Sequence, residues 1–194
     1  MPKPYDLTTY AGKRVDWLTR VALEAVAQRL GYDLTIVQGS YNAGGVAASA
    51  GTHDGGGAVD LAPYDHARKV LELRRAGFAA WYRPAIPGLW GAHVHAVLIG
   101  NKRLSAGARA QVAEYLAGYD GLAGDGRDTG PRDFTGNRFR WRTGAGRVTK
   151  ARQLLERAHA QLATGVRGYG TNKARRDLRN ALENLPTIPK ENAR

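Results

Sequence analysis

Apolar residues follow two different spacings along the first 117 residues of the chain, and these spacings predict a mixture of helices and strands. Helical spacing, with apolar residues every three or four positions, covers residues 13–30, 64–75 and 105–117. Short runs rich in branched and aromatic residues predict strands at residues 33–38, 57–61, 78–82 and 93–99. We therefore expect an α+β fold in which a small antiparallel sheet packs with helices.

The stretch from 118 to 146 has a different character. It is rich in glycine, aspartate and arginine and has few aliphatic residues, so we expect a loop or linker. Its aromatic residues Phe134, Phe139 and Trp141 are candidate anchors onto a neighbouring surface. Helical spacing then returns and predicts a basic helical hairpin. The predicted parts are a first domain at 1–117, a linker at 118–146 and a C-terminal helical region at 147–194.

The composition limits the chemistry that the chain can perform. The chain has 194 residues and 43% of them are hydrophobic, which is enough for an ordinary folded domain. It has no cysteine, so disulfides, zinc ribbons and thiol catalysis are excluded, and any metal must be bound by histidine and carboxylate ligands. We expect no membrane span, since no apolar run has the required length.

The formal net charge of +12 is unevenly distributed. Residues 144–194 hold 11 basic and 4 acidic residues, whereas residues 1–143 hold 18 and 13. A basic tail of this kind indicates either an anionic polymer as partner or an ordinary solvated helical face, and charge alone favours neither. Nucleic acid is the less favoured polymer, because the basic residues are not interleaved with aromatic residues that could stack on bases.

Three of the five histidines lie in two short segments that together have the composition of a metal site. His53 precedes a run of glycines that lets the backbone fold back toward Asp60, and His95 lies on a later strand. Two imidazoles and one carboxylate leave a position open for water, as in catalytic zinc sites. His93 shares a strand face with His95, so we assign it general acid–base work or stabilisation of an intermediate. His66 and His159 are expected to be surface residues.

The pattern His53-x-x-Gly56-x-Ala58-x-Asp60, followed by a strand bearing His93-x-His95, resembles the zinc D-alanyl-D-alanine carboxypeptidase family. That family includes phage endolysin peptidases, and its fold resembles the hedgehog signalling domain. The resemblance covers about residues 13–117 and implies that the first domain, 1–117, is a zinc peptidase domain that cleaves peptide bonds of bacterial peptidoglycan. It implies that His53, Asp60 and His95 bind Zn²⁺ and that His93 is the catalytic partner.

The chain departs from the family pattern at two places. Gly51 stands where the family usually has serine, and the loop before the motif carries Tyr41 and Asn42 without the arginine of many members. Arg83 is the candidate replacement for that catalytic arginine, or else an ordinary loop arginine. The residues expected to bind substrate are Tyr41, Asn42, Trp81 and Trp90.

The leading hypothesis is therefore an endolysin-like zinc metallopeptidase whose basic C-terminal region binds anionic wall polymers. The N-terminal segment lacks the apolar core of a signal peptide, so we expect synthesis in the host cytoplasm and action on the cell wall after release. A second hypothesis is a virion or tail-associated structural protein that contains the peptidase domain. A third is a binding module built on an inactive peptidase scaffold.

Overall fold

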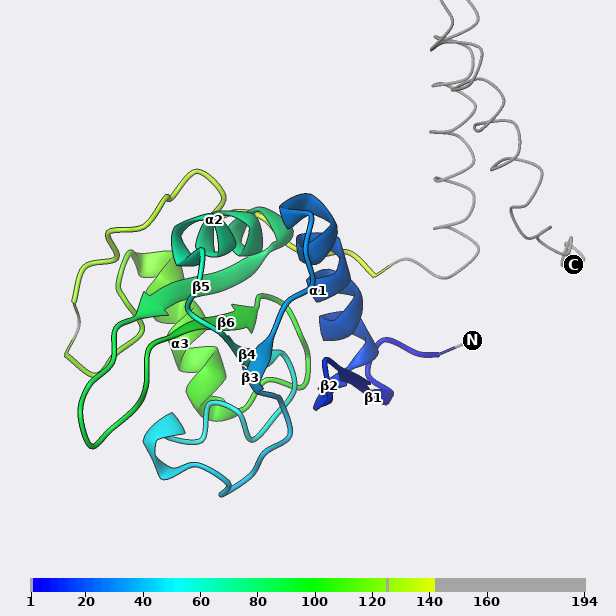
Figure 1. The fold of residues 1–194 in the computed structure, drawn as a ribbon, viewed down its shortest axis with the longest axis horizontal. Coiled ribbons are helices and arrows are strands. Elements are labelled where there is room, and N and C mark those ends of the chain that lie inside the picture. Colours follow the sequence, from blue (N-terminus) through cyan, green and yellow to red (C-terminus); the bar gives the residue numbers. More distant parts are fainter. Residues whose placement is uncertain (1, 125, 142–194) are drawn as a thin grey trace, which may run out of the picture. The chain divides into compact units, whose positions relative to one another are not determined.

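The computed structural model describes residues 2–124 and 126–141, and these form one compact unit from Pro2 to Trp141 (Figure 1). The end of the predicted linker and the whole predicted basic hairpin, residues 142–194, lie outside the described residues. Within the described part, every helix is too short or too polar to cross a membrane.

The described unit is an α+β fold with two antiparallel sheets and three α-helices, as the sequence predicts. A two-stranded sheet is formed by β1 (Leu7–Tyr10) and β2 (Lys13–Asp16). A four-stranded sheet has the order β3 (Ile36–Gln38), β4 (Ala58–Leu61), β6 (His93–Leu98) and β5 (Phe78–Arg83). The helices are α1 (Trp17–Leu30), α2 (His66–Ala76) and α3 (Ala106–Ala117), and a 3₁₀ turn spans Ala47–Ser49.

The predicted helix at 13–30 is wrong over its first four residues, which form strand β2. This strand pairs with β1 through a tight turn in which Ala11 and Gly12 both have positive φ, as two-residue hairpin turns require. The helix begins after Asp16, whose carboxylate accepts a hydrogen bond from the Thr19 backbone at 2.8 Å and so caps the first turn. An apolar period alone does not mark this boundary, because Val15 is buried in either conformation.

The four-stranded sheet separates two hydrophobic clusters. Side chains that alternate to one face pack against α1 and α2 and form the main core. From the sheet these are Val59, Leu61, Phe78, Ala80, Val94, Ala96 and Leu98. The opposite face carries Ala58, Ala79, Trp81 and Val97, which pack against α3 and the turn before it. Strand alternation directs the histidines of β6 to this second face, and His95 contacts Gln111 of α3 there. Figure 1 shows α3 beside β6.

The described residues between 118 and 141, which exclude residue 125, form loops without a helix or a regular strand, and they pack on the body of the protein. Phe139 and Trp141 contact the main core, and Phe134 lies under the guanidinium of Arg75, so the three aromatic residues act as the predicted anchors. The compact unit consequently extends past residue 117 and ends at Trp141.

Candidate metal centre

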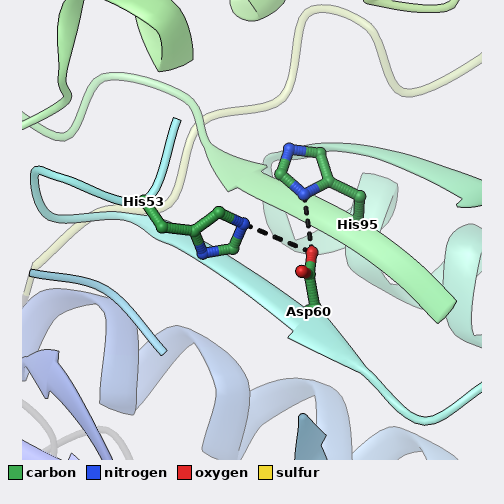
Figure 2. Close-up of side chains that lie close together, drawn as sticks. All are labelled: His53, Asp60 and His95. Atoms are coloured by element: carbon green, nitrogen blue, oxygen red, sulfur yellow. Dashed lines mark hydrogen bonds and ion pairs between the residues drawn. The ribbon is translucent and has the colours of Figure 1, made fainter. Parts of the chain in front are cut away.

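His53, Asp60 and His95 converge at one end of the four-stranded sheet. Asp60 and His95 are directly opposite each other in the β4–β6 pair, so their side chains share the face that α3 covers. Asp60 Oδ1 lies 2.7 Å from His95 Nδ1 and 3.4 Å from His53 Nε2 (Figure 2). All three side chains are buried, and one ligand atom from each lies within 4.8 Å of the others. The structure thus brings together the three residues that the sequence predicts as ligands.

The loop that carries His53 is held between two other segments of the chain. The backbone N–H groups of Tyr41 and Asn42 donate to the carbonyls of Gly55 and His53, both at 2.9 Å. On the other side, a Cβ at Gly55 would stand 2.2 Å from the Arg103 carbonyl oxygen. The glycine is therefore needed for close packing against residues 103–105, and this packing fixes the direction of His53.

The outward-facing nitrogen of each imidazole meets a hydrogen-bond acceptor. His53 Nδ1 lies 3.0 Å from the Gly39 carbonyl oxygen, and His95 Nε2 lies 2.8 Å from Gln111 Oε1. The Gln111 amide is oriented by its NH₂ group, which donates to the Gly121 carbonyl at 3.2 Å. Because these oxygens only accept, each ring carries a proton on the outer nitrogen. The inner nitrogens, His53 Nε2 and His95 Nδ1, face the Asp60 carboxylate, and the 2.7 Å contact between His95 and Asp60 is a hydrogen bond whose proton a metal ion could replace.

Two imidazoles that face a carboxylate form a group that could hold a metal ion. Burial opposes ionisation of Asp60, but the hydrogen bonds with His53 and His95 outweigh it and hold the Asp60 pKa well below its usual range. Burial lowers the pKa of His95, against the opposing effect of Asp60. An anionic Asp60 and a neutral His95 are the protonation states that a metal ion requires of its ligands.

His93 stands beside this group in the orientation expected of a neighbouring base. Its Nδ1 lies 2.7 Å from the Gly91 carbonyl oxygen, so its proton is on that side and the Nε2 lone pair faces inward. Nε2 is 3.8 Å from Asp60 Oδ1, further away than either of the other two histidines. The side chain is also more exposed than theirs, at 15%. His93 can therefore reach a molecule bound at the centre while it remains open to the cavity.

A cavity of about 290 Å³ opens over the centre. The floor is formed by His53, Asp60, His93 and His95, and the walls come mainly from residues 46–49 and 89–92. Trp90 and Arg83 line the cavity, as the sequence predicts for substrate-contacting residues. Arg83 pairs with His93 across β5 and β6 and is only 6% exposed. Burial lowers the pKa of its guanidinium, and the nearby Asp120 carboxylate opposes that shift.

The remaining three predicted substrate residues lie elsewhere. The Trp81 ring lies under His95 in a near-parallel arrangement, with ring centres 6.2 Å apart, and supports that histidine from below. Tyr41 directs its hydroxyl to Asp16 Oδ2 at 3.0 Å, inside the body of the protein. Neither Tyr41 nor Asn42 is among the residues that line the cavity, and both hold the His53 loop through their backbone N–H groups.

Gln111 is the functional residue that sequence reasoning missed. It lies on the face of α3 that also carries Ala108 and Tyr115, both of which are fully buried. A glutamine at an inward-facing helical position is a detectable signal, because a half-buried amide needs a polar partner. The pattern does not indicate which residue that partner is, since His95 lies on a strand 16 residues earlier in the chain.

We expect the protein to bind one divalent metal ion and to be stabilised by it. A ligand present at about 1,000 times its Kd raises the free energy of unfolding by roughly 4 kcal/mol. Alanine at Gln111 should weaken metal binding about 10- to 100-fold, because His95 loses the acceptor that holds its ring and tautomer. Calorimetric titration with Zn²⁺, and thermal unfolding with and without it, measure both effects. Equal affinity in the wild type and in Gln111→Ala would contradict the assigned role of Gln111.

The fold and the centre define an α+β protein with a buried His–Asp–His group that could hold a metal ion beneath an open cavity. Comparison of the chain with protein-family models, with curated proteins and with solved structures found no match.

Proposed function

We propose that the protein is a zinc-dependent peptidase that hydrolyses peptide bonds in bacterial peptidoglycan. The observation that carries the proposal is the convergence of His53, Asp60 and His95 at the floor of a cavity, with both imidazoles oriented by hydrogen bonds on their outer nitrogens. Two histidines and a carboxylate suit Zn²⁺ and leave a position for water and substrate. The motif resemblance to zinc peptidoglycan peptidases supports the choice of substrate.

The residues around the centre supply the functions that amide hydrolysis requires. A zinc ion bound there would make water a nucleophile near neutral pH and polarise the scissile carbonyl. His93 Nε2 has its lone pair directed inward, so it can take a proton from the attacking water and return it to the leaving amine. Arg83 presents a buried positive charge on the same sheet face, where it can donate to a carbonyl or carboxylate oxygen of the substrate.

The walls of the cavity favour small apolar side chains in the substrate. Val46, Leu89 and Trp90 surround the opening, and the Trp90 indole is held in place by donating to the Pro84 carbonyl at 3.0 Å. A short alanine-containing peptide offers a carbonyl for the centre and methyl groups for these walls. Stem peptides of peptidoglycan have this composition, which is why we propose them before longer-chain proteins.

Digestion of purified peptidoglycan tests the proposal directly. The wild-type protein is incubated with the wall material, with and without a zinc chelator, and the new amino and carboxyl termini are identified by mass spectrometry. We expect cleavage at a single type of peptide bond, its loss with chelator and its recovery when Zn²⁺ is restored. Cleavage that is unaffected by the chelator, or no new termini under any condition, would refute the peptidase assignment.

The basic C-terminal region is proposed to retain the enzyme on the anionic wall. Deletion of residues 144–194 removes 11 basic residues, so we expect weaker binding to wall sacculi and a smaller dependence of that binding on salt. Cleavage of short soluble peptides should be unchanged. Cosedimentation with sacculi over a series of salt concentrations measures the binding. Identical sedimentation of the full-length and truncated proteins would show that the region has another role.

A further inference from the structure

A second cavity, of about 620 Å³, adjoins the one above the metal centre. The two cavities share Arg83, Trp90 and Leu122 as lining residues, so they meet at these three side chains. The second cavity continues from there between the start of α2 and the loop at residues 127–131. A substrate that enters over the centre therefore has room to extend past Arg83, into a space larger than the first cavity.

The acidic groups of the second cavity are already engaged in the fold. Asp128 forms ion pairs with Arg74 and Arg132, each at 2.9 Å. Asp120 Oδ1 accepts a hydrogen bond from the Leu122 backbone at 2.9 Å and shapes the turn there. Arg74 is in turn engaged in the fold, because it also donates to the carbonyls of Ala80 and Pro131. None of these groups is available to a ligand without loss of structure.

Two positive charges at the cavity have no carboxylate partner among the described residues. Arg83 is only 6% exposed. Its guanidinium donates one hydrogen bond among the described residues, to the Asp120 backbone carbonyl. Arg127 is exposed at the far side, where its guanidinium lies 5.0 Å from the centre of the Tyr119 ring and makes no ion pair with a described residue. Nearby carboxylates, above all that of Asp120, favour the charged form of Arg83 without forming an ion pair with it, so an anionic ligand would offset more of the cost of burying this guanidinium.

The remaining wall is apolar and aromatic. His66 and Tyr82 stack with ring centres 3.9 Å apart, and together with Ile86 and Pro131 they form a surface that can cover the aliphatic part of a ligand. A site with this apolar wall and two arginines suits a flexible ligand with an aliphatic part and a carboxylate group. A neutral peptide would leave both arginines unpaired.

We propose that the second cavity binds a carboxylate of the substrate between Arg83 and Arg127, on the far side of Arg83 from the metal centre. The peptidase then selects peptides that bear an acidic group beyond the scissile bond. The claim that the ligand is a peptidase substrate rests on the proposed function. The carboxylate site itself depends only on the two arginines. Arg127 is its specificity-determining residue, since Arg83 serves both cavities.

Binding of two versions of one probe tests the site. Soluble fragments released from peptidoglycan by a glycan-cleaving enzyme are used untreated and after conversion of their carboxylates to amides. Calorimetric titrations use the zinc-loaded His93→Ala protein, in which slow turnover leaves the fragments intact, with and without Arg127→Gln. Lys102→Ala, which removes an exposed positive charge outside both cavities, is the matched control.

We expect untreated fragments to bind about tenfold more tightly than amidated ones, as one charge-assisted hydrogen bond provides. Arg127→Gln should abolish the difference and Lys102→Ala should retain it. No preference for the untreated fragments, or an equal preference in Arg127→Gln, overturns the carboxylate site even if chelator-sensitive cleavage is observed. An Arg127-dependent preference without any cleavage by the wild type supports the site and refutes the peptidase function.

Discussion

Alanine in place of His95 is expected to remove the bound metal and to lower peptidoglycan cleavage by about a thousandfold. The substitution deletes one of only two imidazole ligands and leaves the Asp60 carboxylate without its 2.7 Å partner. A catalytic metal contributes several kcal/mol to transition-state stabilisation, and each 1.36 kcal/mol corresponds to a tenfold change in rate. A loss of about 4 kcal/mol of this stabilisation gives the thousandfold decrease.

The matched comparison is His93→Ala, which changes the neighbouring histidine on the same strand face. Removal of a general acid–base group lowers the rate by about 10²- to 10⁴-fold. Because His93 is not part of the His53–Asp60–His95 group, one equivalent of zinc should remain bound. Metal content is measured by atomic absorption and cleavage by the release of new amino groups. Full zinc occupancy in His95→Ala would show that the metal is held elsewhere.

Methionine in place of Arg74 is expected to destabilise the protein by about 3–5 kcal/mol, as loss of one partner of a buried ion pair does. The Arg74 side chain is 1% exposed and joins three segments: it donates twice to Ala80 of β5, at 2.7 and 3.0 Å, once to the Pro131 carbonyl, and once to Asp128 at 2.9 Å. The substitution keeps the aliphatic volume but leaves the carbonyls and the Asp128 carboxylate without this donor. The loop 118–141 should then detach at lower denaturant concentration.

Arg68→Met is the control for this prediction, because it lies on the same helix and pairs with Asp65 at 3.9 Å while half exposed. A surface pair of this kind contributes about 0–1 kcal/mol. Urea unfolding followed by tryptophan fluorescence compares the two variants with the wild type. Equal stabilities of Arg74→Met and Arg68→Met would mean that the buried network does not hold the loop to the body.

Local sequence patterns predict most of the helices and strands, because each element depends on the spacing of apolar residues within a short run. The strand at 93–98 and the helix at 106–117 are examples. Alternation defines the strand, and Ser105 caps the start of the helix by accepting a hydrogen bond from the Ala108 backbone at 3.1 Å. The hairpin of β1 and β2 was not predicted, because its strands are short and its register depends on a turn at Ala11 and Gly12.

For the candidate centre, the sequence by itself determined which side chains could hold a metal. His53 and Asp60 are joined by a glycine-rich segment, and the alternation of a strand places His93 and His95 on one face. These relations are local, since they depend on residue types and on spacings of a few positions.

Only the tertiary structure decided how those side chains are oriented and what surrounds them. The acceptors of the outer ring protons are the Gly39 carbonyl and Gln111, which come from a loop 14 residues before His53 and from a helix 16 residues after His95. One wall of the cavity beyond Arg83 is formed by Asp120, Leu122 and residues 127–131, within a stretch that local spacing predicts merely as a loop. The order of the strands and the packing of the loops bring these groups together, and neither depends on periodicity within a single segment.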